Sequence, residues 1–320
     1  MDLWLVGQML FWLNVPFYGV LWVLTFIRCV LYPRKVYADL LHDGRSFGFL
    51  TTAAATCVLG TQFLIIGGLW SVAALLWALG ILLWAVLTYA IITAITVKEP
   101  KPGLAEGING GWLLPVVAAQ SVAVLGAQLA GGFAAAQQPH VLLFCLIVWF
   151  CAGMLYVWII SLIYYRYMFF SLSPSDLAPP YWINMGAVAI STLAGTLLLD
   201  AAPRSTLISD LMPFIKGATL LFWSTATWWI PMLIILELWR HGYRKFPLRY
   251  DPLYWGLVFP LGMYTACTFR LTQVMPGAQS LLFIPRAFVY VALAAWALTL
   301  VGLLRQLATC AARAVMNTSA

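Results

Sequence analysis

The sequence predicts an all-α polytopic membrane protein, because its composition and its long apolar runs exclude a water-soluble fold. Hydrophobic residues make up 63% of the 320 residues, charged residues make up only 8%, and the mean hydropathy is +0.93. A helix needs about 20 apolar residues to cross a bilayer, and most of the chain consists of such runs. No stretch between the runs exceeds roughly 15 residues, which is too short for a packed core. Residues 1–320 are therefore predicted to form a single transmembrane domain.

Nine membrane-spanning helices are predicted from these runs. In chain order they cover 4–32, 47–67, 70–97, 108–130, 140–168, 180–200, 210–239, 253–274 and 280–305. Several exceed the roughly 20 residues that a span requires, which predicts tilted helices or extended ends. Prolines lie inside or near the start of five of them, namely Pro16, Pro115, Pro231, Pro260 and Pro285. Neighbouring helices must satisfy the backbone groups that these residues free.

The predicted helices alternate between two types along the chain. The first, third, fifth, seventh and ninth are bulky and rich in Leu, Trp, Ile and Phe. The second, fourth, sixth and eighth each begin with an aromatic residue and continue through small residues; the aromatic residues are Phe47, Trp112, Tyr181 and Tyr254. This alternation predicts helical hairpins with an inner ring of small-residue helices inside an outer ring of bulky ones. Close helix packing is the competing explanation of the small residues, but it does not account for the bulk of the alternate helices.

The inner ring is predicted to form a pore for anions. An ion at the bilayer centre needs water or polar groups around it, and hydroxyl groups and backbone dipoles supply them. A cation path would be expected to show acidic side chains, and a proton-coupled carrier a buried carboxylate or histidine, but the four small-residue helices carry no Asp or Glu in their middle. The candidate pore-lining residues are Thr52, Thr56, Pro115, Ala118, Ser121, Gly186, Ser191, Pro260 and Tyr264.

The basic residues predict the orientation of the chain. Alternate loops carry thirteen of the 17 basic residues: Arg28, Arg34, Lys35, Arg45, Lys98, Lys101, Arg166, Arg240, Arg244, Lys245, Arg249, Arg305 and Arg313. By the positive-inside rule these loops and the C-terminus are cytoplasmic, and the N-terminus is outside. Near the outer helix ends, Lys216, Arg270 and Arg286 are expected to raise the local anion concentration. The alternative is that these three side chains snorkel to lipid headgroups.

With the N-terminus outside, the alternating series of small-residue and bulky helices lacks its first member. A small-residue helix before residue 1 would complete five small–bulky pairs and would return the N-terminus to the cytoplasm. We expect either that the chain begins one helix late or that this protein has lost that helix.

No metal, cofactor, catalytic site or nucleic-acid partner is expected. The six cysteines include no C-x-x-C pair and are expected to be packing residues. The three histidines, His42, His140 and His241, lie in loops or at helix ends without a second ligand at metal spacing. An enzyme would need a nucleophile with a base, and the sequence shows no such pair. The net charge of +7 fits basic loops at a membrane rather than nucleic-acid binding.

Two motifs resemble those of one transporter family. Residues 254–262, Tyr-Trp-Gly-Leu-Val-Phe-Pro-Leu-Gly, resemble the penultimate-helix signature of the tellurite-resistance/dicarboxylate transporter family. Residues 112–118, Trp-Leu-Leu-Pro-Val-Val-Ala, resemble its fifth-helix motif. That family includes the TehA-type proteins of bacteria and the SLAC-type slow anion channels of plants. The resemblance covers the whole chain, except that the family's first helix has no counterpart here.

The resemblance implies a fold of ten helices in five hairpins with quasi-fivefold symmetry. Five inner helices surround a pore in each subunit, and the subunits form homotrimers in the bacterial inner (plasma) membrane. A phenylalanine plugs the pore, and the matching residue here is Phe259. A flat apolar ring in a narrow lumen blocks ions and keeps water out. Because the helix without a counterpart is one of the five pore liners, its absence would leave an open seam.

The expected function is a passive channel for small inorganic or organic anions, gated by Phe259, with the lipid bilayer as its surroundings. One alternative is a secondary exporter of a specific anion, such as sulfite, tellurite or a dicarboxylate. An exporter should carry a discrete mid-membrane site, often with a charged partner, and no such partner is evident. The other alternative is a non-conducting structural subunit, which the missing helix favours.

Overall fold

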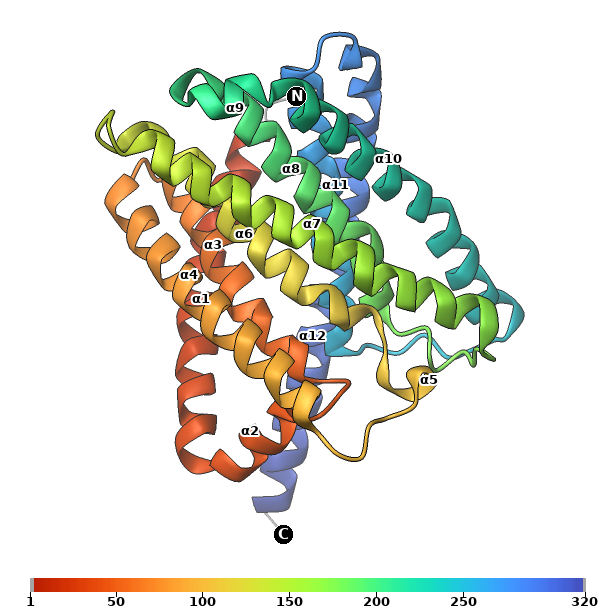
Figure 1. Ribbon diagram of the computed structural model, residues 1–320. Coiled ribbons are helices and arrows are strands. Elements are labelled where there is room, and N and C mark those ends of the chain that lie inside the picture. Colours follow the sequence, from red (N-terminus) through yellow and green to blue (C-terminus); the bar gives the residue numbers. More distant parts are fainter. Residues whose placement is uncertain (1–2, 319–320) are drawn as a thin grey trace.

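The computed structural model describes residues 3–318, which form helices and no strand. The long helices run back and forth between two ends of the molecule (Figure 1). They are α1 Trp4–Leu31, α3 Thr51–Ile65, α4 Trp70–Val97, α6 Leu114–Leu129, α7 Gln138–Phe169, α8 Ile183–Ala201, α10 Met212–Glu237, α11 Trp255–Val274 and α12 Phe283–Thr318. Three short helices connect them, namely α2 Pro33–Leu40, α5 Leu104–Gly107 and α9 Thr206–Asp210. The all-α class is confirmed.

Within residues 3–318, eight helices are long and apolar enough to cross a membrane when the turns that extend them are included. The predicted span over 253–274 is helical as α11, but α11 is not among the eight. Its second half carries several polar residues, namely Thr265, Thr268, Arg270, Thr272 and Gln273. Eight of the nine predicted spans thus meet this criterion of length and composition, and α11 is less apolar because it packs inside the protein.

The inner and outer layers follow the predicted alternation. Every residue of α8 except Asp200 is buried, and in α6 only Leu114 and Gln128 are not. In contrast, Phe11 is the single buried residue of α1. Each small-residue helix packs against the bulky helix that follows it: α3 on α4, α6 on α7, α8 on α10 and α11 on α12.

The four inner helices form an open ring. Helix α3 packs on α6, α6 on α8, and α8 on α11. Helices α3 and α11, at the two ends of this series, have no comparable contact with each other. We call the gap between them the open side.

Glycine allows close approach of inner helices to their neighbours. A side-chain carbon added at Gly186 of α8 would lie 2.7 Å from the Cγ atom and 2.9 Å from the Cβ atom of Pro260 in α11. At Gly126 of α6, an added carbon would lie 2.7 Å from the indole ring of Trp77. Close packing, the competing explanation of the small residues, is thus confirmed at these two positions.

Tryptophans of the outer helices are hydrogen-bonded to the inner helices. The indole N–H of Trp77 in α4 donates to the Val122 carbonyl in α6 at 2.9 Å. The indole N–H of Trp149 in α7 donates to the Ser191 carbonyl in α8 at 2.8 Å. A buried indole generally needs such a partner, and these two bonds fix how each outer helix is rotated against its inner neighbour.

One end of the molecule, which we call the basic end, gathers the loops that follow α1, α4, α7 and α10. It is the lower part of Figure 1, where α2 and α5 lie. An ion pair from Lys98 to Asp43 at 2.6 Å connects the loops that follow α4 and α1, and one from Arg166 to Asp176 at 3.6 Å holds the loop after α7 against the end of that helix. The N-termini of all four inner helices lie at this end, because each follows one of these loops.

Candidate functional site

The four inner helices begin in the same way, with a 3-10 turn that leads into the α-helix. The turns are Ser46–Leu50 before α3, Gly110–Leu113 before α6, Pro179–Trp182 before α8 and Pro252–Tyr254 before α11. Each turn contains the aromatic residue that marks the repeat in the sequence. Such turns tighten the first turn of a helix and bring its backbone N–H groups together. The sequence repeat is therefore also a structural repeat.

Short polar side chains and proline set where these turns begin. The Asn109 side chain accepts a hydrogen bond from the Gly111 N–H at 2.8 Å, and the Asp251 side chain accepts one from the Leu253 N–H at 2.8 Å. Both are N-caps, which satisfy N–H groups that the helix itself leaves free. Pro179 opens the turn before α8, where a missing N–H costs nothing.

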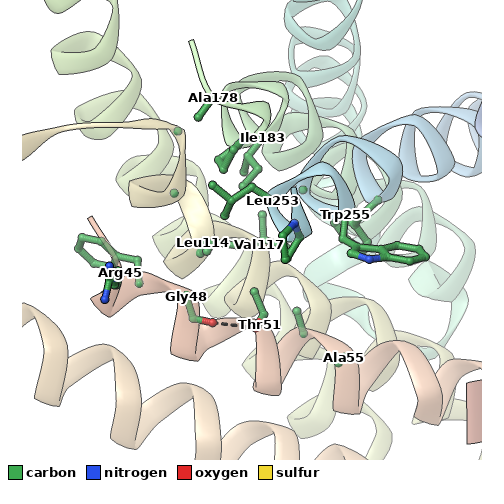
Figure 2. A pocket seen from close by; sticks show the side chains of 18 of the residues that line it. Arg45, Gly48, Thr51, Ala55, Leu114, Val117, Ala178, Ile183, Leu253 and Trp255 are labelled. Carbon is green, nitrogen blue, oxygen red and sulfur yellow. Dashed lines mark hydrogen bonds between the residues drawn. The ribbon is translucent and has the colours of Figure 1, made fainter. Parts of the chain in front are cut away.

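A cavity of about 790 Å³ lies where the four turns meet. Figure 2 shows side chains of α3, α6, α8 and α11 facing one another across it. The wall formed by the helix starts consists of Phe47, Gly48, Gly110, Gly111, Pro180, Tyr181, Pro252 and Leu253. Deeper in, the wall is apolar and includes Ala54, Val117 and Ile183. The cavity therefore extends from the helix starts at the basic end along the inner helices.

The electrostatic field in the cavity favours anions. Each helix N-terminus carries about half a positive charge, and four of them converge here. Free backbone N–H groups at a helix start are also direct anion ligands. Of the two charged residues in the wall, Asp43 is neutralised by Lys98 at 2.6 Å, whereas Arg45 shares the carboxylate of Asp39, at 3.0 Å, with Arg28 and keeps part of its charge. The helix N-termini and the remaining charge of Arg45 therefore have the same, positive sign.

Phe259 forms part of the cavity wall from the second turn of α11. Its ring packs against the apolar core of the inner helices and is partly buried. The next residue, Pro260, has no N–H, so the carbonyl of Gly256 loses its helical partner on the same wall. Pro260 in turn packs against Gly186, and this contact fixes the distance of α11 from α8 near Phe259. The structure thus places Phe259 between the cavity and the interior of the bundle.

Helix α1 also contributes to the cavity, which the sequence pattern did not predict. Asn14, Tyr18 and Leu21 lie in the wall on the side of α3. The Asn14 amide donates to the Gln62 side chain at 2.8 Å, and the Tyr18 hydroxyl is 2.8 Å from that of Thr56. An Asn in the middle of a lipid-length apolar run is costly unless it faces protein or water, and this was the signal available in the sequence.

The other predicted pore-lining residues lie apart from this cavity. Thr56 touches it only through Tyr18, and Thr52 lines a second, smaller cavity. The remaining seven are buried and are absent from the wall: Pro115, Ala118, Ser121, Gly186, Ser191, Pro260 and Tyr264. Their role in lining a pore stays a prediction.

Tyr264 shows most clearly why burial and pore lining are different properties. Its hydroxyl lies 2.9 Å from that of Thr227 in α10, and its ring packs edge-on against Phe288 in α12 with centroids 5.0 Å apart. Both partners belong to the outer layer. The Tyr264 side chain is therefore directed outward from the inner ring.

At the end opposite the basic end, Arg270 is already paired. It donates a hydrogen bond to Asp200 at 3.1 Å, which joins the last turns of α11 and α8. This pairing weakens the field that Arg270 presents to an approaching anion. Lys216 lies near the start of α10 and is partly buried, and Arg286 lies near the start of α12 and is exposed. Their predicted role in attracting anions stays a prediction.

No group of three or more His, Cys, Asp or Glu side chains that could hold a metal ion occurs in the part of the chain that the structure describes.

Comparisons with known proteins match most of the chain. A family model described as SLAC1, voltage-dependent anion channel, matches residues 2–304. An uncharacterized membrane protein of Mycobacterium tuberculosis is 40% identical over 158 residues, which cover 48% of this chain and 77% of that protein. An uncharacterized transporter of Methanocaldococcus jannaschii is 24% identical over 276 residues, which cover 84% of this chain and 76% of that protein. A second transporter of the same organism is 24% identical over 272 residues, covering 83% of this chain and 74% of the relative.

Proposed function

The chain belongs to the SLAC1 family of anion channels, and on that premise we propose that it is a passive channel for small inorganic or organic anions, gated by Phe259. The observation that carries this proposal is the convergence of four helix N-termini on one cavity whose wall includes Phe259. We further propose a homotrimer in the bacterial inner (plasma) membrane, with the basic end and the C-terminus in the cytoplasm.

Conduction through this site needs attraction without tight binding. An anion entering at the basic end meets N–H dipoles and loses only part of its hydration. The charged side chains at the mouth already form ion pairs within the protein, which weakens any ion pair that they form with the passing anion. Small anions can therefore enter and leave quickly, as conduction requires.

Phe259 supplies the barrier in this mechanism. Its ring is apolar and borders the cavity where the wall becomes apolar, so an anion that passes must displace it or lose its hydration beside it. Truncation to alanine removes the ring but leaves the helix starts unchanged. We expect anion flux to rise steeply without a change of selectivity.

The test is chloride or nitrate flux into liposomes that contain the purified full chain. Phe259→Ala is compared with wild type and with Phe269→Ala, which removes a 47% exposed ring from the same helix away from the cavity. We expect a small wild-type flux, a large flux in Phe259→Ala, and a wild-type flux in Phe269→Ala. Equal fluxes in the two alanine variants would refute the gate.

A secondary transporter of a specific anion is the second candidate function. The observation that favours it is the volume of the cavity, about 790 Å³, which is large enough for a dicarboxylate. A transporter would exchange labelled anion for unlabelled anion across the membrane and would saturate. A channel would let flux follow the electrochemical gradient without obligatory exchange and without saturation at the same concentrations.

A non-conducting structural subunit is the third candidate, and the open side of the inner ring favours it. A pore that lacks one wall would leak or stay closed. Absence of flux from folded wild type and from folded Phe259→Ala would support this candidate.

A further inference from the structure

A second cavity, of about 320 Å³, lies between the last turns of α1, the short helix α2 and the start of α3. Its wall includes Arg28, Asp39, Arg45, Thr51 and Thr52. It lies where the apolar run of α1 ends at the basic end, which is the depth of the lipid headgroups when α1 spans the bilayer.

Two arginines and one carboxylate give this second cavity a net positive charge. Asp39 accepts a hydrogen bond from Arg45 at 3.0 Å and another from Arg28, so that it holds both guanidinium groups at the cavity. Asp39 is only 16% exposed, whereas Arg28 is 53% exposed and Arg45 is 68% exposed. Each guanidinium has five N–H groups, so most of them remain free for another acceptor. Paired guanidinium groups suit a phosphate.

The second cavity adjoins the main one. Arg45, Gly48 and Thr51 lie in the walls of both. Gly48 marks a wide junction, because a side-chain carbon added there would meet no atom within 4 Å. Beyond the junction, the wall beside α1 and α3 includes the apolar residues Leu21, Ala55 and Val58. A polar, positively charged compartment thus leads directly into an apolar one.

We propose that this combined cleft binds one anionic phospholipid from the leaflet at the basic end. The phosphate lies against Arg28 and Arg45, and one acyl chain lies along α1 and α3 toward the open side. The exposed Arg34 and Lys35 of α2 add positive charge beside the headgroup. The apolar compartment selects a lipid over a free phosphate ion, because a free ion gains nothing from an apolar wall. The acyl chain would occupy part of the cavity that the proposed anion path uses, but the lipid binding itself does not depend on conduction.

The test is native mass spectrometry of the full chain in detergent, titrated with phosphatidylglycerol or with phosphatidylcholine carrying the same acyl chains. We expect one phosphatidylglycerol to bind more tightly than phosphatidylcholine. Arg28→Gln combined with Arg45→Gln should weaken phosphatidylglycerol binding by about fivefold for each arginine removed. Arg305→Gln, which removes an exposed charge from α12, is the matched control and should bind as wild type does.

A second variant tests the apolar part of the cleft while keeping every charge. Gly48→Trp fills the junction between the cavities and should also lower the affinity for phosphatidylglycerol, with the melting temperature serving as a check of folding. Inorganic phosphate at millimolar concentration should not displace the lipid. Equal binding of the two lipids, unchanged binding in the double arginine variant, or displacement by inorganic phosphate would each overturn the proposal.

Discussion

Replacing Gly186 by alanine should separate α8 from α11 and thereby weaken the fold around Phe259. The added carbon would lie 2.7 Å and 2.9 Å from two side-chain carbons of Pro260, and 3.3 Å from its Cα atom. Carbon atoms make their best contact at about 3.5–4.0 Å, so the overlap is roughly 1 Å. The proline ring is rigid and cannot rotate away, which means that the backbone of α11 must move.

The size of the effect follows from a matched pair of variants. Overpacking a well-packed core costs about 1–3 kcal/mol, whereas any glycine-to-alanine change within a helix also gains about 0.5–1 kcal/mol. At Gly262 of α11 an added carbon meets no atom within 4 Å, so Gly262→Ala retains the gain without the overlap. The difference between Gly186→Ala and Gly262→Ala therefore isolates the overlap, at about 1–3 kcal/mol.

The assay is thermal unfolding of the detergent-solubilised full chain, with each kcal/mol expected to shift the melting temperature by about 2–4 °C. Gly186→Ala should melt below Gly262→Ala, and its anion flux should differ from that of wild type because Phe259 moves with α11. Equal melting temperatures in the two variants would show that α8 and α11 are not in this close contact.

Three further predictions concern single contacts. Trp149→Phe removes the indole hydrogen bond to α8 and should lower the free energy of unfolding by about 1–3 kcal/mol, measured by chemical denaturation. The hydrogen bond from Arg45, followed by that from Arg28, holds the pKa of Asp39 below its ordinary value. The stability that this carboxylate contributes is therefore present above about pH 4 and is lost as the pH falls further. In a pH series of melting temperatures, Asp39→Asn should not show that part of the loss of stability in acid. Asp200→Asn frees the charge of Arg270 at the mouth opposite the basic end, so chloride flux should rise at low ionic strength and return to the wild-type value at about 1 M salt. No rise at low salt would show that Arg270 does not act on passing anions.

The layers of the fold could be predicted because the amino-acid composition of each helix indicates whether it lies in the inner or the outer layer. Bulky runs form the outer helices and small-residue runs form the inner ones, and the four repeated aromatic residues mark the four 3-10 turns. The site at the starts of the inner helices could be predicted only in part. Phe259 was identified through the family motif, since nothing in its own apolar surroundings sets it apart from the other phenylalanines.

The direction of individual side chains could not be predicted. Helix α8 is buried all round, so its sequence has no polar face that would reveal its rotation. Tyr264 illustrates the consequence: its position on an inner helix indicated the pore, but its hydrogen bond directs it to α10. The contribution of α1 to the cavity and the open side are likewise tertiary features, because they depend on which helices meet rather than on the composition of any one.

The most direct test of the central claim is the reversal potential of Phe259→Ala in a planar bilayer under a potassium chloride gradient, recorded beside wild type. If the four helix N-termini set the sign of the potential in the cavity, the current reverses close to the equilibrium potential of chloride. A reversal close to the equilibrium potential of potassium would contradict the account, because a cation would then be passing a cavity that the backbone makes positive.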